Sequence, residues 1–437
     1  MNTLEQQLQD ALHRHADSGG ARTPLDLAGV KGRARRIVRR RRATAVGLAA
    51  AVAAVLVPAT LAVAPAFDRG SEAPVAPRPT PAPAPTPEHA LPGDTTLDFR
   101  DLPSGPAPSI GYLDLTGEIP VVVERDGNET LLELQHEPVH HTALADGRYV
   151  VLTRDDEGVG YVEVTDSGGT TRQAHRTVQG FAVDDTHTQV AWADPDGEVM
   201  VLAARVEEPR VLAQVDGATR LTVTDLAGRD CFATPEPGGQ ESGCVVRVGT
   251  SGVPGPGFLV TGQEVLPVEG TTEEFFRHSD SISLGDPQET SWTTWTAGIR
   301  RLGEGTACSE VYGKGPGAAE TSVLVETCEH VFATFSPDAT SLLAWGTENG
   351  GYHPTVAVYD LTTGSVRWQR SATTAEMGQV AYAEWEDEEH LVASVFQGGA
   401  WQLVRFDRDG AVERLTEPVA GDMLEPAYLP EVQQSTW

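Results

Sequence analysis

The chain has 437 residues, of which 63 are acidic and 32 are Lys or Arg, for a net charge of −31. Residues 1–42 hold ten Arg or Lys and four Asp or Glu, a net charge of +6, which leaves −37 for the rest of the chain. Such an acidic remainder excludes nucleic acid and anionic lipid as ligands of that part.

The first 42 residues predict a basic helical segment. Eight of the twelve residues from 31 to 42 are cationic, and an uncharged run follows them directly. Arg and Lys stay on the cytoplasmic side of a membrane, so this collar places residues 1–42 inside the cell. The four residues expected to orient the span are Arg39, Arg40, Arg41 and Arg42.

Residues 43–67 contain no charge and predict one transmembrane helix. A helix crosses a bilayer core with about 20 apolar residues, so this run is long enough. The alternative is a cleaved signal peptide, for which Ala64-Pro65-Ala66 would be the cleavage site. A signal peptide has a short basic region and a shorter apolar run, which favours the anchor. We expect a single-pass protein of the cell membrane, with its N-terminus cytoplasmic and its C-terminal domain extracellular.

Residues 68–97 are rich in Pro and Ala and predict a linker. Such a composition adopts extended polyproline II structure, so the segment would act as a semi-rigid stalk. A ligand for a proline-reading domain is the other interpretation.

Residues 98–437 predict an all-β domain. Short apolar strands alternate with turns rich in Gly, Asp, Asn and Pro, as in hairpins; examples lie at 119–134, 147–169, 188–205, 340–368 and 390–415. Similar apolar strands begin near residues 148 and 188, about 40 residues apart, and near residues 341 and 390, about 50 residues apart. That period is typical of β-propeller blades, and the length allows about seven, with six to eight possible. A tandem of β-sandwiches is the alternative, but it does not explain the repetition.

All four cysteines lie in the predicted exterior part, where disulfides persist. Four cysteines allow three pairings. We predict the local one, Cys231 with Cys244 and Cys308 with Cys328, because each bridge would staple a long hairpin. Zinc is the alternative, although no C-x-x-C is present.

The segment Val358 to Trp368, VYDLTTGSVRW, is similar to the tryptophan-docking repeat of quinoprotein-type propellers. The positions that match its motif are Asp360, Thr363, Gly364 and Trp368. The resemblance implies that Trp368 packs against the next blade. It implies no quinone site, because the motif occurs once, and we expect no cofactor. FATFSPDATSLLAW, from residue 332, resembles the blades of WD40-like and TolB-like propellers.

The order of basic segment, span, stalk and propeller resembles actinobacterial membrane proteins associated with extracytoplasmic-function sigma factors. The use of only two lysines in 437 residues agrees with such a GC-rich source. The zinc anti-sigma pattern H-x-x-x-C-x-x-C is absent from residues 1–42, so any restraint of a sigma factor would not use it.

Three polar clusters are candidates for sites. His136, His140 and His141 are expected in a solvated loop rather than at a metal. The run from Asp194 to Gly197 resembles the start of a calcium loop but lacks the later ligands, so a hairpin turn is expected. The run from Glu386 to His390 is expected to be a solvated charged turn, with a calcium or substrate site as the alternative.

The tryptophans indicate packing. Trp192, Trp345 and Trp385 are expected between blades. Trp292 and Trp295 were weighed as a sugar-stacking groove, but in a strand they would face opposite sides.

No catalytic motif such as G-x-S-x-G or H-E-x-x-H is present. We therefore predict a binding or receptor module and not an enzyme, with an exterior protein or glycan as ligand and a possible cytoplasmic protein partner. Two alternatives stay open: a propeller enzyme acting on envelope glycans or peptides, and a scaffold for envelope assembly.

Overall fold

The computed structural model describes residues 95–433, with gaps at 216–219, 229–230, 232–243, 251–257, 262–263, 268–274, 285–292, 303–305, 315–321, 347–353 and 373–377. The predicted cytoplasmic segment, the predicted span with its arginine collar and most of the predicted linker lie outside these residues. Among the residues described, no helix is long and apolar enough to cross a membrane.

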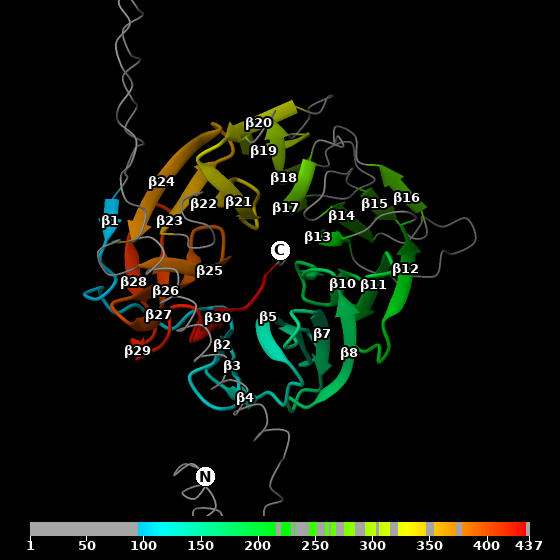
Figure 1. Ribbon diagram of the computed structural model, residues 1–437, viewed down its shortest axis with the longest axis horizontal. Helices are drawn as coiled ribbons and strands as arrows, with labels where there is room; N and C mark the ends of the chain where they lie inside the picture. The colour runs from blue at the N-terminus through cyan, green and yellow to red at the C-terminus, as the bar shows by residue number, and fades with distance from the viewer. Residues whose placement is uncertain are drawn as a thin grey trace, which may run out of the picture. The chain divides into compact units, whose positions relative to one another are not determined.

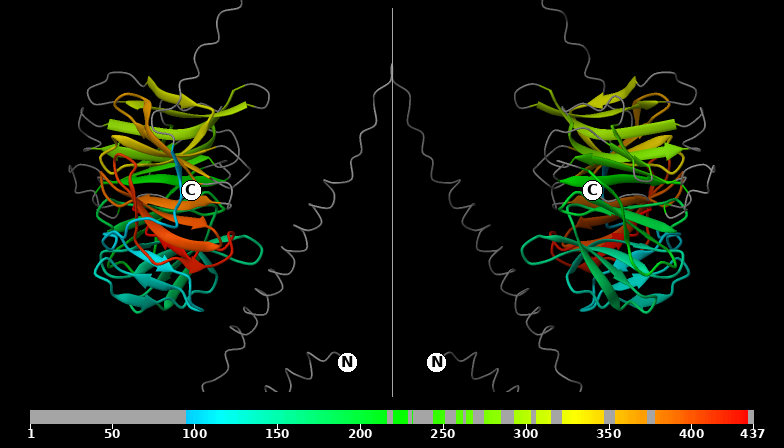
Figure 2. Two further views of the ribbon diagram at one scale, coloured as in Figure 1. Left: turned by 90° about the vertical axis from the view of Figure 1, so that its left-hand side faces the viewer. Right: turned by 90° about the vertical axis from the view of Figure 1, so that its right-hand side faces the viewer.

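The described residues form seven β-sheets arranged around a central axis (Figure 1). Each sheet has four or five strands, and its neighbours along the chain are also its neighbours in space, as expected of a β-propeller. Figure 2 shows the same ring from the side. The prediction of an all-β propeller is confirmed, and we call each sheet a blade.

In most blades the chain runs from the innermost strand outward through antiparallel hairpins. The blade of β5–β8 consists of β5 (Glu137–Ala143), β6 (Tyr149–Arg154), β7 (Gly160–Thr165) and β8 (Thr171–Thr177). The next consists of β9 (Ala182–Val183), β10 (Gln189–Ala193), β11 (Glu198–Ala203) and β12 (Arg210–Gln214). The third consists of β13 (Leu221–Ala227), β14 (Val245–Thr250), β15 (Phe258–Thr261) and β16 (Glu264–Pro267).

The next three blades continue the same pattern. The fourth blade consists of β17 (Phe275–Leu284), β18 (Thr293–Leu302), β19 (Thr306–Lys314) and β20 (Ser322–Thr327). The fifth consists of β21 (His330–Phe335), β22 (Ser341–Gly346), β23 (Thr355–Asp360) and β24 (Ser365–Ala372). The sixth consists of β25 (Gln379–Trp385), β26 (Leu391–Gln397), β27 (Ala400–Phe406) and β28 (Val412–Arg414), with β29 (Val419–Ala420) also paired to β27.

The last blade joins the two ends of the domain. Its outer strands are β2 (Tyr112–Asp114), β3 (Val121–Val123) and β4 (Glu129–Leu131), and its innermost strand is β30 (Tyr428–Pro430). Strand β30 pairs antiparallel with β2, so a strand from the end of the domain closes the ring against one from its beginning.

Strand β1 (Thr95–Leu97) pairs parallel with β24 at the outer edge of that blade. These three residues belong to the segment predicted to be linker, and the ordered domain therefore includes them. The chain then crosses the blade of β25–β28, where the buried Phe99 donates its backbone N–H to Gln397 Oε1 at 2.7 Å and accepts from Gln402 Nε2.

The predicted hairpins correspond to β3–β4, β6–β7, β10–β11, β22–β23 and β26–β27. The four repeated apolar strands noted in the sequence are β6, β10, β22 and β26, which are the second strands of their blades. A second strand lies between two others and between two neighbouring blades, which explains why it is apolar along its whole length.

The core of the domain consists of separate apolar clusters between adjacent blades. Trp345 and Trp385 share one cluster that joins the blades of β21–β24 and β25–β28. Trp192 belongs to another, with Val150 and Phe181, between the blades of β5–β8 and β9–β12. The prediction that these three tryptophans pack between blades is confirmed.

Candidate functional site

Both predicted disulfides are present. Cys231 pairs with Cys244, with a Cα–Cα distance of 4.7 Å, and Cys308 pairs with Cys328, with a Cα–Cα distance of 4.1 Å. The first closes the connection between β13 and β14, and the second links β19 to the end of β20. Each bridge lies within one blade, as the prediction of stapled hairpins requires.

The segment with the docking motif forms the β23–β24 hairpin. Asp360 Oδ1 accepts the backbone N–H groups of Thr362 at 2.8 Å and Thr363 at 3.2 Å, and Gly364 adopts a left-handed φ of 70°. Trp368 is 3% exposed, and its ring stacks on Phe406 of the next blade with ring centroids 5.5 Å apart.

The expectation that His140 and His141 lie in a solvated loop is wrong. Both are in the innermost strand β5, and His141 is fully buried, with no hydrogen-bond partner for either ring nitrogen among the described residues. Burial lowers the pKa of His140 to about 3 and that of His141 to about 4, so both rings are neutral. The third member, His136, hydrogen-bonds the buried Glu163 at 2.9 Å and stacks on Tyr161.

The run from Glu386 to His390 is a turn between β25 and β26, but its first residue is not solvated. The side chain of Glu386 is 2% exposed and forms a two-pronged ion pair with Arg405, at 2.5 and 2.8 Å. Glu386 also accepts the backbone N–H of Ser109, in the segment that crosses this blade. The carboxylate therefore fixes that segment. The sequence did not indicate this role, because Glu386 stands in an acidic run of the kind that is usually solvated.

The run from Asp194 to Gly197 is the predicted turn, between β10 and β11. Gly197 N donates to Asp194 O at 3.2 Å, and Asp194 Oδ1 accepts from the backbone N–H groups of Asp196 and Glu198. Among the residues described, no group of three or more His, Cys, Asp or Glu is arranged to hold a metal ion.

Trp292 lies outside the described residues. Trp295 is 8% exposed and belongs to the apolar cluster with Phe332 and Tyr359, so it packs in the core and is not on a groove surface.

A cavity of about 610 Å³ lies where three blades meet at the ends of their innermost strands. It is lined by the β3–β4 turn, by the β5–β6 turn, by the β9–β10 turn and by the residues that follow β30. We call it the three-blade pocket. Small residues such as Gly111, Ala143 and Gly147 form part of its wall.

The side chain of Glu431 lies in the three-blade pocket and is 7% exposed. Its Oε2 accepts the backbone N–H of Gly111 at 2.8 Å, and its Oε1 accepts that of Ala143 at 3.0 Å. His187 Nδ1 is 3.7 Å from the same Oε1. One carboxylate therefore ties the residues after β30 to Gly111 of the same blade and to Ala143 of the next blade, and forms a negative group inside the pocket.

Tyr149 and Glu124 form another part of the pocket wall. The Tyr149 hydroxyl donates to Glu124 Oε1, and burial together with this hydrogen bond raises the pKa of Tyr149 to about 12. Asp126 and Asp185, both exposed, also line the pocket, as does Arg125. The lining thus holds four carboxylates, one guanidinium and one imidazole; the carboxylates are those of Glu124, Asp126, Asp185 and Glu431.

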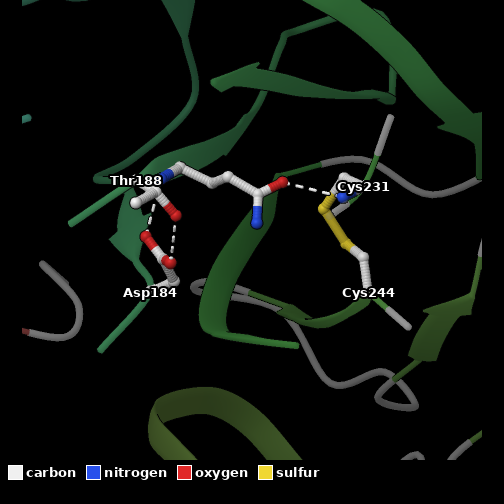
Figure 3. Close-up of a disulfide and its surroundings, with 5 residues drawn as sticks. Asp184, Thr188, Cys231 and Cys244 are labelled. Carbon is white, nitrogen blue, oxygen red and sulfur yellow. Dashed lines mark hydrogen bonds between the residues drawn. A yellow bond between two sulfur atoms is a disulfide. The ribbon is translucent and has the colours of Figure 1, made fainter. Parts of the chain in front are cut away.

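The β9–β10 turn, which we call the pocket loop (Asp184–Thr188), is held by a buried carboxylate. Asp184 Oδ2 accepts the hydroxyls of Thr186 at 2.5 Å and Thr188 at 2.7 Å. His187 has a left-handed φ of 53°. Figure 3 shows Asp184 and Thr188 beside the Cys231–Cys244 bridge of the next blade.

Sequence reasoning missed the three-blade pocket. Its residues come from five separate segments, and none of them carries a motif. One local signal was present: the D-D-T-H run in the pocket loop has the composition of a side-chain-capped turn. The role of Glu431 had no local signal at all, because its partners are 288 and 320 residues away.

No model of a known protein family matches the sequence, and comparison with curated proteins found no relative. Solved β-propellers are similar. The β-propeller domain of the Trilobed protease from Pyrococcus furiosus matches with a TM-score of 0.37 and 10% identity, over 65% of this chain and 85% of that one. The β-propeller domain of Cps50 (Swd1) from Myceliophteria thermophila matches with a TM-score of 0.43 and 8% identity, over 71% and 90%.

The acylaminoacyl peptidase of Pyrococcus horikoshii matches with a TM-score of 0.35 and 12% identity, over 65% of this chain but only 46% of the peptidase. This chain therefore spans less than half of that enzyme. At such identities these likenesses concern the propeller fold alone and indicate neither a ligand nor an activity.

Proposed function

We propose that this chain is a membrane-anchored binding module that takes a cationic group of an exterior partner, a guanidinium or an alkylammonium, into the three-blade pocket. The observation that carries the proposal is the lining of that pocket, where four carboxylates outnumber one arginine. Opposite charges attract more strongly in a recess than on an open surface, because low-dielectric walls focus the field.

The state of the polar groups in the pocket favours binding over catalysis. Glu431 uses both carboxylate oxygens to accept backbone N–H groups, and the Tyr149 hydroxyl is committed to Glu124. A phenol with a pKa of about 12 stays protonated at neutral pH and is a poor general base. Groups held in this way orient a ligand well, but they are not poised to exchange protons with it.

Membrane anchoring and an exterior location are part of the proposal. The uncharged run at 43–67 behind a basic collar supports the anchor, and two disulfides in the propeller support an oxidising compartment. Coupling to a cytoplasmic partner such as a sigma factor is supported by the layout of the chain, and it would be made by residues 1–30.

Alkaline phosphatase fused after residue 94 tests the topology. We expect exported phosphatase activity that stays with the membrane fraction, and a soluble mature protein beginning near residue 67 would contradict the anchor.

Ligand binding is tested with the full-length chain in detergent and a fluorescent peptide, Gly-Arg-Gly-Arg-Gly, by fluorescence anisotropy. We expect binding that weakens with added salt, and no binding of the matched Gly-Gln-Gly-Gln-Gly peptide. Putrescine, added as a competitor, tells whether a free alkylammonium suffices.

The Asp185→Asn variant is expected to weaken binding about threefold, the effect of one partly screened charge. The matched control is Glu157→Gln, which removes one exposed charge from the β6–β7 turn, at the other end of β6 from the pocket. Equal losses in both variants would mean that the peptide binds the acidic surface at large. Binding of the neutral peptide alone would reject the cationic ligand but leave the pocket as a site.

A further inference from the structure

A hydrogen bond joins the pocket loop to the disulfide of the next blade. Gln189, the first residue of β10, is 2% exposed, and its Oε1 accepts the backbone N–H of Cys231 at 2.8 Å. Cys231 is bonded to Cys244, which is fully buried just before β14. The contact therefore runs from the blade of β9–β12 to that of β13–β16, beside the labelled Asp184 and Thr188 in Figure 3.

The same glutamine is tied to the carboxylate that shapes the loop. Gln189 N donates to Asp184 Oδ1 at 2.6 Å, while Asp184 Oδ2 accepts the hydroxyls of Thr186 and Thr188. The backbone at Gln189 and the conformation of the loop are thus fixed by one side chain.

The backbone of His187 indicates that contacts with its surroundings restrain the pocket loop in this conformation. A left-handed φ is unfavourable for a residue other than glycine and persists only where the surroundings enforce it. His187 N donates to Asp184 O at 2.9 Å, and its Nδ1 is 3.1 Å from Ala143 O in the neighbouring blade. Release of Asp184 would remove one of these restraints and move the imidazole within the pocket.

The Gln189 side chain depends on Cys231. Its Nε2 is buried without a hydrogen-bond partner, so in the described residues the bond from Cys231 is the one that its amide makes. Loss of that bond would leave a whole amide buried and unsatisfied, which favours a rearrangement. The disulfide keeps Cys231 in place at the start of the connection that it closes.

We propose that the Cys231–Cys244 disulfide, through Gln189, holds the pocket loop in its binding conformation, so that the three-blade pocket binds its ligand more tightly when this pair is oxidised than when it is reduced. The proposal rests on the proposed function of the pocket. Reduction by an external dithiol would break the S–S bond with two electrons and two protons, giving two thiols and the oxidised dithiol. Gln189 and Asp184 are positioning residues in this arrangement.

The test uses hydrogen exchange measured by mass spectrometry on peptides that cover residues 184–189 of the full-length chain. In the double variant Cys231→Ala/Cys244→Ala we expect exchange to accelerate about tenfold, the effect of losing one buried hydrogen bond. The affinity for the Gly-Arg-Gly-Arg-Gly peptide should fall by a similar factor. The matched control is Cys308→Ala/Cys328→Ala, which also removes a disulfide and should lower Tm without changing either quantity.

Gln189→Ala, which keeps both disulfides, tests the link itself. It should accelerate exchange of the loop in the oxidised chain and add less than about a twofold effect to the Cys231→Ala/Cys244→Ala variant, because groups in one network are not additive. Unchanged exchange in the loop, or equal acceleration by both cysteine pairs, would overturn the proposal. Accelerated exchange in a chain whose wild type binds neither peptide would support the positioning and reject the proposed function.

Discussion

At the scale of single residues, Trp368 joins two blades by one aromatic stack. Its ring lies at 15° to that of Phe406, and the Arg370 guanidinium lies 5.7 Å from its centroid. Gly410 makes this position possible, because a Cβ there would be 2.9 Å from two atoms of the Trp368 ring. The tryptophan ring therefore packs closely against both Phe406 and the turn that contains Gly410.

Trp368→Ala should lower the free energy of unfolding by about 3 to 5 kcal/mol, since it leaves a large cavity. Trp368→Phe should cost less, because Trp368 Nε1 makes no hydrogen bond to any residue that the structure describes, so no such bond is lost. Urea denaturation followed by circular dichroism measures both. An unchanged midpoint for Trp368→Ala, with ready oxidation of Trp368 in the folded wild type, would place this residue on a surface instead.

The buried His141 makes stability depend on pH. Its pKa is about 4 in the folded chain, because of burial, against about 6.5 in an unfolded chain. A depressed pKa means that the folded state resists protonation, so stability is complete above about pH 6.5 and falls as the pH drops towards 4. The loss is at most about 1.4 kcal/mol per pH unit for one histidine.

We therefore expect His141→Leu to flatten this acid limb of the stability curve, measured by urea denaturation between pH 7 and 4. His140 should leave a residual slope, because its pKa is lowered too. A slope that His141→Leu does not change would mean that other groups cause the acid loss.

At the scale of elements, two turns of one blade have the same conformation and different surroundings. Gly158 ends the β6–β7 turn with a φ of 83°, and Gly169 ends the β7–β8 turn with a φ of 84°. A Cβ on Gly158 would meet nothing within 4 Å, whereas one on Gly169 would lie 1.9 Å from Leu131 O in the neighbouring blade. The second turn is also a contact between blades, because Gly169 O accepts the N–H of Glu133 at 2.8 Å.

Gly158→Ala should cost about 1 kcal/mol, the strain of a left-handed alanine. Gly169→Ala should cost at least about 1 to 3 kcal/mol more, because the backbone must also move to relieve the overlap. Since the backbone strain is matched, the difference in thermal unfolding isolates the blade contact. Equal melting temperatures would show that the β7–β8 turn moves away without loss.

At the scale of the whole molecule, a three-residue strand closes the ring. Leu429 of β30 is 1% exposed and packs with Leu113 of β2, in its own blade, and with Tyr149 of β6, in the next blade. Glu431 then ties the same strand to Gly111 and Ala143. Ring closure and the three-blade pocket thus depend on the same few residues at the end of the domain.

Leu429→Asp should prevent stable closure, because it buries a charge between two blades. Leu424→Asp is the matched control, since Leu424 is 62% exposed in the segment before β30. We expect rapid proteolysis and loss of cooperative unfolding for the first variant and near wild-type behaviour for the second. Cooperative unfolding of Leu429→Asp would mean that the remaining strands hold the ring without β30.

The hairpins, the repeat and the disulfide pairing could be predicted from the sequence, because each depends on residues near one another in the chain. Alternation of apolar and polar residues sets which face of a strand is buried, and Asp and Gly residues set the turns. The pairing of Cys231 with Cys244 could be predicted because the two residues are only 13 positions apart in the sequence.

The contacts between blades could be seen only in the folded domain. Polar residues such as His141 and Glu386 have a polar local context and were therefore expected to be solvated, yet His141 is buried in the innermost strand of its blade, and Glu386 is buried against Arg405 and the segment that contains Ser109. The pairing of β1 with β24 and the place of Glu431 in the three-blade pocket join segments more than 270 residues apart. Closing a ring brings such segments together through the packing of every blade, and no local pattern records which side chains will then meet.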